Sequence, residues 1–156
     1  MPERSSRYLL DNNLFIAAVK SGWTASTDLI FNLLESSADL FADEILFFEY
    51  EKYANVLGAY DLFDLLKKRI IEINPSQDEI TICEGYFQDP AKQAADIVHA
   101  ATCLYTKSIL ITNDKHFDKI RDAGIIEVWS STKAIKRILL HEEDYDDPIL
   151  QPPKRR

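Results

Sequence analysis

The sequence contains little cysteine. Of its 156 residues only two are cysteines, Cys83 and Cys103, and both lie in apolar segments that are typical of helices. We therefore expect two buried, reduced thiols rather than a disulfide or a cysteine metal site.

An excess of positive charge is also absent. The chain has 18 Lys and Arg against 26 Asp and Glu, a net charge of -8. This balance argues against broad electrostatic binding to nucleic acid or to an anionic membrane. It does not exclude an enzyme that acts on nucleic acid, because a metal-binding pocket needs carboxylates and a small basic rim can hold phosphates.

Long hydrophobic runs are missing as well. No apolar run approaches the ~18 residues of a membrane span, and the N-terminal MPERSSR is polar. Hydrophobic residues nevertheless make up 46% of the chain, enough for one domain with a sizeable core. We expect a cytoplasmic protein with no membrane segment. Its folded domain would span residues 1–140, and a charged, flexible tail would follow at 141–156.

Short apolar runs alternate with helix-like segments along the chain. Strands that alternate with helices predict an α/β fold, with a mostly parallel sheet covered by helices on both faces. The five runs that we expect to form strands are residues 8–11, 38–42, 69–74, 108–112 and 125–129.

Capping signals mark several helix starts. Ser26 or Thr27 could cap the helix that follows them, and Ser76-x-x-Glu79 is a capping box. Asp89-Pro90 suits the first residues of the helix that contains AADIVHAATCLY. Residues 59–89 otherwise carry no sharp motif.

Two acids end two of the predicted strands. Asp11 follows the apolar run at 8–10, and Asp114 follows SILIT in the sequence ITND. In open α/β sheets, sites form outside the carboxyl ends of the strands, so these two carboxylates would be close if their strands are neighbours. The alternative is that each acid only caps the helix that follows it.

Two further acids lie on predicted helices. A helical wheel places Glu49 on the apolar arc with Ile45 and Val56, where an unpaired carboxylate is costly. A neighbouring Lys, Arg or Tyr could equally well pair with it. Asp96 lies at the edge of the apolar face of its helix. His99 points elsewhere, so we expect a surface or partly buried histidine rather than a ligand.

Together, these four acids suggest a metal site. Hard cations such as Mg²⁺ and Mn²⁺ prefer oxygen ligands, and three or four converging carboxylates would repel one another without a cation. A metal held in this way can generate hydroxide from water and stabilise displacement at phosphorus.

The four acids occur in an order that resembles the PIN domain, and within it the VapC-like toxins of prokaryotic toxin–antitoxin pairs. The resemblance spans about residues 7–140. It rests on D-x-N at Asp11 to Asn13, a Glu in EYEKYANVL, an Asp in ADIVHAA, and T-x-D-x-x-F from Thr112 to Phe117.

The resemblance implies a three-layer α/β/α fold with a five-stranded sheet in the order 3-2-1-4-5. It implies an Mg²⁺- or Mn²⁺-dependent endoribonuclease acting on RNA, a homodimer, and inhibition by a small antitoxin. The residues that match the family's acidic quartet are Asp11, Glu49, Asp96 and Asp114, and those that match supporting polar positions are Asn13, Thr112 and Asn113.

Three other readings compete with a toxin nuclease. A phosphoryl-transfer domain is disfavoured. A receiver domain requires an Asp at the end of the third strand, where this chain has Asn74-Pro75, and a phosphatase requires D-x-D where this chain has DNN. An RNA-processing PIN nuclease outside a toxin pair, and a catalytically silent PIN-like binding module, both stay open. Candidate phosphate contacts are Lys20, Lys107 and Lys115.

Overall fold

One five-stranded sheet forms the centre of the structure, a computed structural model that describes residues 6–20 and 22–142. All neighbouring strands pair in parallel, in the order β3-β2-β1-β4-β5. This confirms the predicted α/β fold and strand order. The strands are β1 (Arg7–Leu10), β2 (Asp39–Ala42), β3 (Ile70–Glu72), β4 (Ile109–Ile111) and β5 (Glu127–Trp129).

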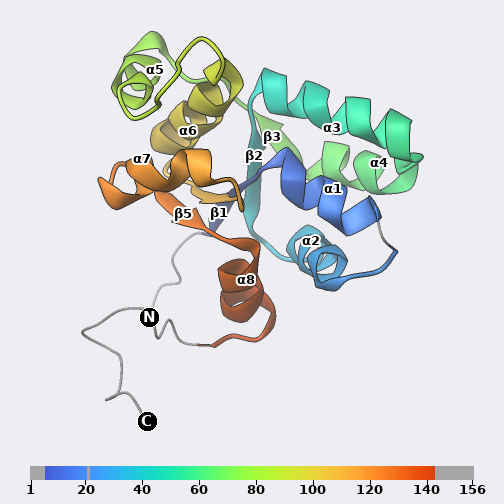
Figure 1. The fold of residues 1–156 in the computed structure, drawn as a ribbon. Coiled ribbons are helices and arrows are strands. Elements are labelled where there is room, and N and C mark those ends of the chain that lie inside the picture. The colour runs from blue at the N-terminus through green and yellow to red at the C-terminus, as the bar shows by residue number, and fades with distance from the viewer. Residues whose placement is uncertain (1–5, 21, 143–156) are drawn as a thin grey trace.

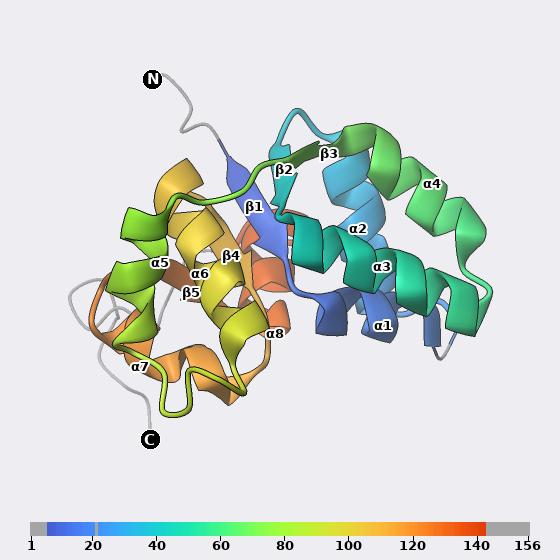
Figure 2. The same ribbon diagram turned by 90° about the horizontal axis from the view of Figure 1, so that it is seen from above.

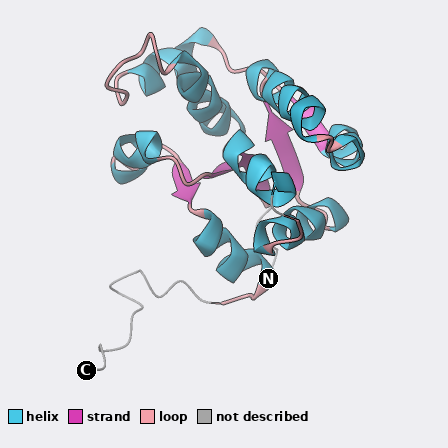
Figure 3. Ribbon diagram, turned by 45° about the vertical axis from the view of Figure 1, so that its right-hand side comes forward, coloured by secondary structure: helices cyan, strands magenta, loops and turns pink. Residues whose placement is uncertain are grey.

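Helices surround this sheet in Figure 1 and Figure 3, and the view from above in Figure 2 separates them into two groups. One group contains α1 (Asn12–Lys20), α2 (Ala25–Glu35), α3 (Glu44–Leu57) and α4 (Tyr60–Arg69). The other contains α5 (Gln77–Glu84), α6 (Ala94–Thr106) and α7 (Asp118–Asp122), which the short 3-10 helix η1 (Lys115–Phe117) precedes. After β5, α8 (Ser131–Ala134) continues into η2 (Ile135–Leu139), a π-helical turn that contacts α2.

Strand β1 lies in the middle of the sheet, between β2 and β4. Its residues Tyr8, Leu9 and Leu10 are all buried, on both faces. A strand that is covered on both faces reads as a continuous apolar run rather than an alternating one, because neither face meets water. The abrupt change to Asp11 therefore marks the point where the chain leaves the core.

The capping residues differ in part from those predicted. Thr24, rather than Ser26 or Thr27, caps α2, with a reciprocal pair of hydrogen bonds to Thr27. Ser76 and Glu79 form the predicted capping box before α5. The prediction for Asp89-Pro90 was wrong, because the residues after Pro90 form a turn and α6 begins only at Ala94.

The structure also bears on the expectations for the cysteines, for membrane spans and for the charged tail. Cys83 and Cys103 are both free and buried, as predicted. Within residues 6–20 and 22–142, no helix is long and apolar enough to cross a membrane. The predicted charged tail at 141–156 lies outside the described residues, apart from His141 and Glu142.

Candidate functional site

Acidic residues follow the carboxyl ends of three neighbouring strands. Asp11 comes directly after β1, Asp43 comes directly after β2, and Asp114 is three residues beyond the end of β4. Because the strands are parallel, these ends meet at one edge of the sheet. The backbone amide of Asp11 donates a hydrogen bond of 3.0 Å to the carbonyl of Ile111, which fixes the ends of β1 and β4 side by side.

Thr112 joins two of the predicted acids. Its hydroxyl donates to Oδ2 of Asp11 at 2.6 Å and accepts from the backbone N–H of Asp114 at 3.0 Å. The other oxygen of Asp11 accepts from the backbone N–H of Asn12 at 2.8 Å. Burial raises the pKa of Asp11, and the hydrogen bond from Thr112 opposes part of that rise. The Asp11 carboxylate is therefore held in one orientation next to the start of the Asp114 loop.

Asp96, Asp114 and His116 form a group that we call the open cluster. Their ligand atoms all lie within 4.8 Å of one another. His116 Nδ1 is 3.1 Å from Asp96 Oδ2 and 3.2 Å from Asp114 Oδ1, and the His116 side chain is 53% exposed. Asp114 also caps η1 by accepting from the backbone N–H of His116, so the capping alternative is correct for this residue without excluding a place in the site.

The open cluster fits a divalent cation in its chemistry. Two carboxylates and one imidazole converge where solvent can enter, and such donors suit Mg²⁺ or, with the nitrogen included, Mn²⁺. Burial raises the pKa of Asp96, the hydrogen bond with His116 opposes this, and the nearby charge of Asp114 raises it further. A cation between Asp96 and Asp114 would remove that repulsion.

Asp43, Glu49 and His99 form a second group, which we call the buried cluster. His99 Nδ1 lies 2.7 Å from Asp43 Oδ2, and His99 Nε2 lies 3.1 Å from Glu49 Oε1. Burial by itself lowers the pKa of His99, but the hydrogen bonds to Asp43 and Glu49 outweigh it and raise the pKa to about 10. The expectation of a surface or partly buried His99 was wrong, because the residue is only 1% exposed.

Helix α3 differs from the helical wheel on which Glu49 was selected. Its buried residues are Leu46, Tyr50 and Ala54, whereas Ile45 and Val56 are exposed. The apolar arc drawn from the sequence was therefore rotated about the helix axis relative to the buried face of α3. Glu49 lies at the boundary of this buried face, and its side chain is 34% exposed. The partner of Glu49 is a histidine, rather than the Lys, Arg or Tyr considered from the sequence.

Tyr50 explains why Glu49 is at the carboxyl edge of the sheet. The Tyr50 side chain is fully buried, and its hydroxyl donates to the carbonyl of Leu10, the last residue of β1. This contact ties α3 to the strand that presents Asp11. Two other acids of this helix, Glu44 and Glu51, are exposed.

The buried cluster contains two residues that sequence reasoning missed. Asp43 ends the apolar run ADLFA just as Asp11 ends its own run, so the rule for strand ends could have identified it. His99 follows Asp96 by three residues, and positions three apart share one side of a helix. The pairing of His99 with Glu49 could not be found in the same way, because Glu49 lies on another helix, α3.

Comparison with known proteins identifies the family. A family model of the PIN domain matches residues 8–123, most of the chain. The chain belongs to the PIN domain family.

Solved structures resemble this PIN domain in fold. VapBC2 from Rickettsia felis, bound to a DNA fragment from its promoter, matches with a TM-score of 0.56 at 16% identity, covering 80% of this chain and 98% of the other. VapBC-1 from nontypeable Haemophilus influenzae matches with a TM-score of 0.56 at 22% identity, covering 81% of this chain and 99% of the other. No curated protein matches the sequence. At these identities the likeness shows a common fold.

The asparagines of this PIN domain differ in their surroundings. Asn13 is exposed, whereas Asn12 is buried and its Oδ1 has no hydrogen-bond partner among the described residues. Asn113 bonds with both of its amide atoms to Ser131 at the start of α8, at 2.9 Å each. Asn113 thus holds α8 against the loop that carries Asp114, and the supporting roles of Asn13 and Asn113 stay predictions.

The three candidate phosphate contacts are spread over the PIN domain. Lys107 is the C-cap of α6, and at 1.5 Å per residue it lies about 16 Å along the helix from Asp96. Lys20 ends α1, about 13 Å along that helix from Asp11 by the same measure. Only Lys115 directly adjoins an acid of the site, so it is the one of the three that the fold places next to the open cluster.

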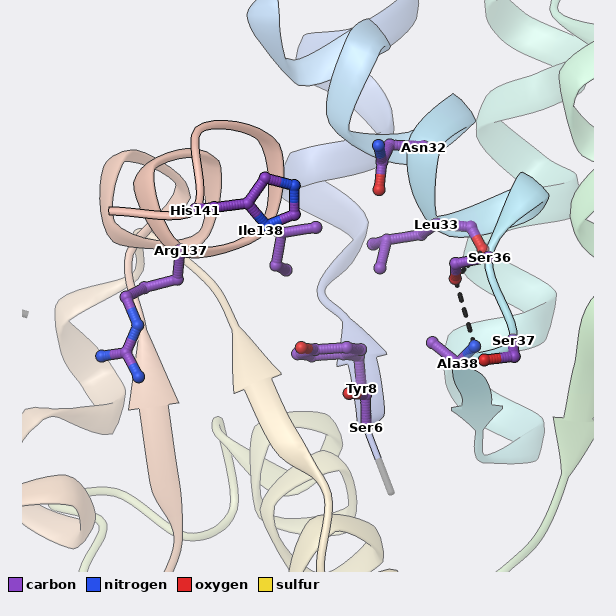
Figure 4. A pocket seen from close by; sticks show the side chains of 10 residues that line it. All are labelled: Ser6, Tyr8, Asn32, Leu33, Ser36, Ser37, Ala38, Arg137, Ile138 and His141. Atoms are coloured by element: carbon purple, nitrogen blue, oxygen red, sulfur yellow. Dashed lines mark hydrogen bonds between the residues drawn. The ribbon is translucent and has the colours of Figure 1, made fainter. Parts of the chain in front are cut away.

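A cavity at the opposite edge of the sheet is separate from the acids. Figure 4 shows Tyr8 of β1, Leu33 of α2 and Ala38 before β2 facing Arg137 and His141 across it. Its volume is about 500 Å³. Because it opens at the amino ends of β1 and β2, it has no part in the chemistry of the acidic edge.

Proposed function

We propose that this PIN domain is a metal-dependent endoribonuclease that hydrolyses phosphodiester bonds of RNA, and that it is the toxin of a toxin–antitoxin pair. The observation that supports it best is the convergence of Asp96 and Asp114, with Asp11 joined to Asp114 through Thr112. These acids lie far apart in the sequence, and the fold brings them to one edge of the sheet.

Asp11, Asp96 and Asp114 would hold Mg²⁺ or Mn²⁺, and Glu49 would complete the site or orient a water molecule. A bound divalent ion supplies a Lewis acid that makes a water molecule more acidic and neutralises charge on the phosphate. Thr112 keeps the Asp11 carboxylate turned toward the end of β4 by its hydrogen bond to Oδ2. Lys115 is exposed beside Asp114 and can contact a phosphate of the bound RNA.

A small antitoxin is the proposed protein partner, and a homodimer is the proposed assembly. The antitoxin is supported by the similarity in fold to the two VapBC structures, and the homodimer only by resemblance to the family. An RNA-processing nuclease outside a toxin pair would use the same acids on the same substrate class. A silent binding module would not require carboxylates converging at an open position, which is why we favour an enzyme.

The experiment that tests the enzyme is Asp11→Asn, assayed for RNA cleavage with Mn²⁺. This change removes a charged ligand but keeps the shape of the side chain. We expect cleavage to fall at least 100-fold while urea unfolding shows an intact fold. Asp64→Asn is the matched control, since Asp64 is an exposed acid on α4. Equal cleavage by the parent and Asp11→Asn would disprove the assignment, and a parent that neither binds Mn²⁺ nor cuts RNA would favour the silent module.

A further inference from the structure

We propose that His99 is a positioning residue for Glu49: it holds one oxygen of the Glu49 carboxylate, so that the other is presented to the metal ion or to the water that the ion binds. This inference rests on the proposed nuclease function. It adds to the acidic quartet a buried histidine and the aspartate that anchors it, Asp43.

Both ring nitrogens of His99 face a carboxylate oxygen, at 2.7 Å and 3.1 Å. A neutral imidazole has one N–H donor and one acceptor nitrogen, and an ionised carboxylate can only accept. Two such contacts are satisfied together only when both nitrogens carry a proton. The geometry therefore makes His99 an imidazolium that donates to Asp43 on one side and to Glu49 on the other.

Asp43 fixes the orientation of the His99 ring. Its side chain is fully buried, and Oδ1 accepts from the backbone N–H of Leu46 at 2.8 Å as the cap of α3. Its Oδ2 accepts from His99 and, at 3.4 Å, from the hydroxyl of Thr102. Turning the His99 ring away would leave the Asp43 charge buried without its partner, which is strongly unfavourable. The orientation of His99 is thus set by the fold rather than by Glu49.

Glu49 is the mobile end of this arrangement, because its side chain is partly exposed and the other two are not. Its Oε1 is bound to His99, and Oε2 makes no hydrogen bond to any residue that the structure describes. A free glutamate side chain samples many rotamers, so the bond to His99 removes conformational freedom before any ion arrives. Oε2 is left to bind an ion or a water molecule.

The charge of His99 also acts on the other acids of the site. It is close enough to Asp11 and to Asp96 to lower the pKa of both, against the larger upward effect of burial. The buried cluster is therefore electrostatically connected to the acids that are proposed to hold the ion. It offsets one negative charge of a site that gathers five carboxylates.

Two neutral replacements separate the two hydrogen bonds of His99. In His99→Gln the side-chain amide nitrogen can take the place of Nε2 and donate to Glu49, and in His99→Asn it can take the place of Nδ1 and donate to Asp43. Both variants lose the same positive charge, so they differ only in which hydrogen bond is kept, the one to Glu49 or the one to Asp43. We expect kcat for RNA cleavage to be at least 10-fold lower in His99→Asn than in His99→Gln, with KM for RNA alike.

If the proposal is correct, the two variants rank in the opposite order in stability to their order in kcat. His99→Asn keeps a donor for the fully buried Asp43 and is expected to be the more stable variant in urea. His99→Gln keeps the donor for Glu49 and is expected to be the more active one and to bind Mn²⁺ more tightly by calorimetry. A merely structural His99 would make activity and Mn²⁺ affinity follow stability, and that result would overturn the proposal.

The Glu49→Gln background completes the test. If His99 acts through Glu49, the difference in kcat between His99→Asn and His99→Gln disappears there; if it persists, the proposal is wrong. If His99→Gln fails to fold, the double variant Asp43→Asn with His99→Gln is compared with His99→Asn instead. The double variant removes the unpaired buried charge of Asp43. The proposed function fails separately, when the parent neither binds Mn²⁺ nor cuts RNA, whereas the present inference can fail while the parent does both.

Discussion

Two histidines of this PIN domain each lie between two carboxylates, and their surroundings are opposite. His99 is fully enclosed between Asp43 and Glu49. His116 reaches between Asp96 and Asp114 from the surface, with about half of its side chain exposed. The same three chemical groups therefore occur twice at one edge of the sheet, once inside the core and once in solvent.

The difference between the clusters indicates that they have different roles. Charges that are buried must be compensated by fixed partners, because removing them from water costs several kcal/mol per ion. The buried cluster meets this demand internally through the two hydrogen bonds of His99, which leave only Oε2 of Glu49 for an ion or a water molecule. The open cluster is exposed to solvent, so its histidine contributes little to stability. A cation that arrives from solution can bind its two carboxylates. We infer that the buried cluster holds the edge together and orients Glu49, whereas the open cluster supplies two of the carboxylates that bind the ion.

The largest expected effect is on stability, when each histidine is replaced by alanine. His99→Ala leaves Asp43 buried without its counter-charge and should lower the free energy of unfolding by about 3–5 kcal/mol. His116→Ala removes exposed contacts only and should cost about 0–1 kcal/mol. Urea unfolding with a chelator present measures both. Similar losses in the two variants would refute the division between the clusters.

The second effect concerns the response of stability to Mn²⁺. An ion that binds only the folded protein raises its free energy of unfolding, by about 2.7 kcal/mol at a hundred times the Kd. We expect the parent and the control Asp64→Asn to show this gain, and Asp114→Asn to lose most of it, because Asp114 is a proposed ligand in the open cluster. Thermal unfolding with and without Mn²⁺ is the measurement. An undiminished gain in Asp114→Asn would place the ion elsewhere.

The sheet was predictable from the sequence because its signals are local. Each strand overlaps a short, mostly apolar run of four to six residues, and the parallel arrangement follows from the alternation with helices. The acids Asp11 and Asp114 were found by the same reasoning, since they are the first charges after such runs. Helix α4 was not predicted, because the residues that follow Gly58, the C-cap of α3, carry no sharp motif.

The contacts of His99 with Asp43 and Glu49 were not predictable, because they depend on tertiary packing. Whether His99 faces solvent or Asp43 depends on how α6 packs beside α3, and an error of one residue in the apolar arc changes the answer. The helical wheel of α3 had such an error, since it counted Val56 as buried. Glu49 was nevertheless selected, because the sequence-based arc contained it, whereas in the structure it lies at the boundary of the buried face of α3.

The third expected effect is the dependence of stability on pH in the metal-free protein. The pKa of His99 is raised from its ordinary value of 6.5 to about 10 in the folded state, because the hydrogen bonds to Asp43 and Glu49 outweigh burial. The folded protein therefore binds one more proton than the unfolded chain between these two values. The stabilisation from His99 is fully present below about pH 6.5 and is lost as the pH rises through about 10.

The free energy of unfolding of the parent should consequently fall between pH 7 and pH 9, by at most about 1.4 kcal/mol per pH unit. In His99→Gln this contribution is absent, and the slope over the same range should be correspondingly flatter. Urea unfolding at several pH values with a chelator measures both slopes, and His116→Gln serves as the comparison from the open cluster. Should His99→Gln retain the full slope of the parent, the bridging imidazolium would not be the group responsible, and the contrast between the two clusters would have to rest on burial alone.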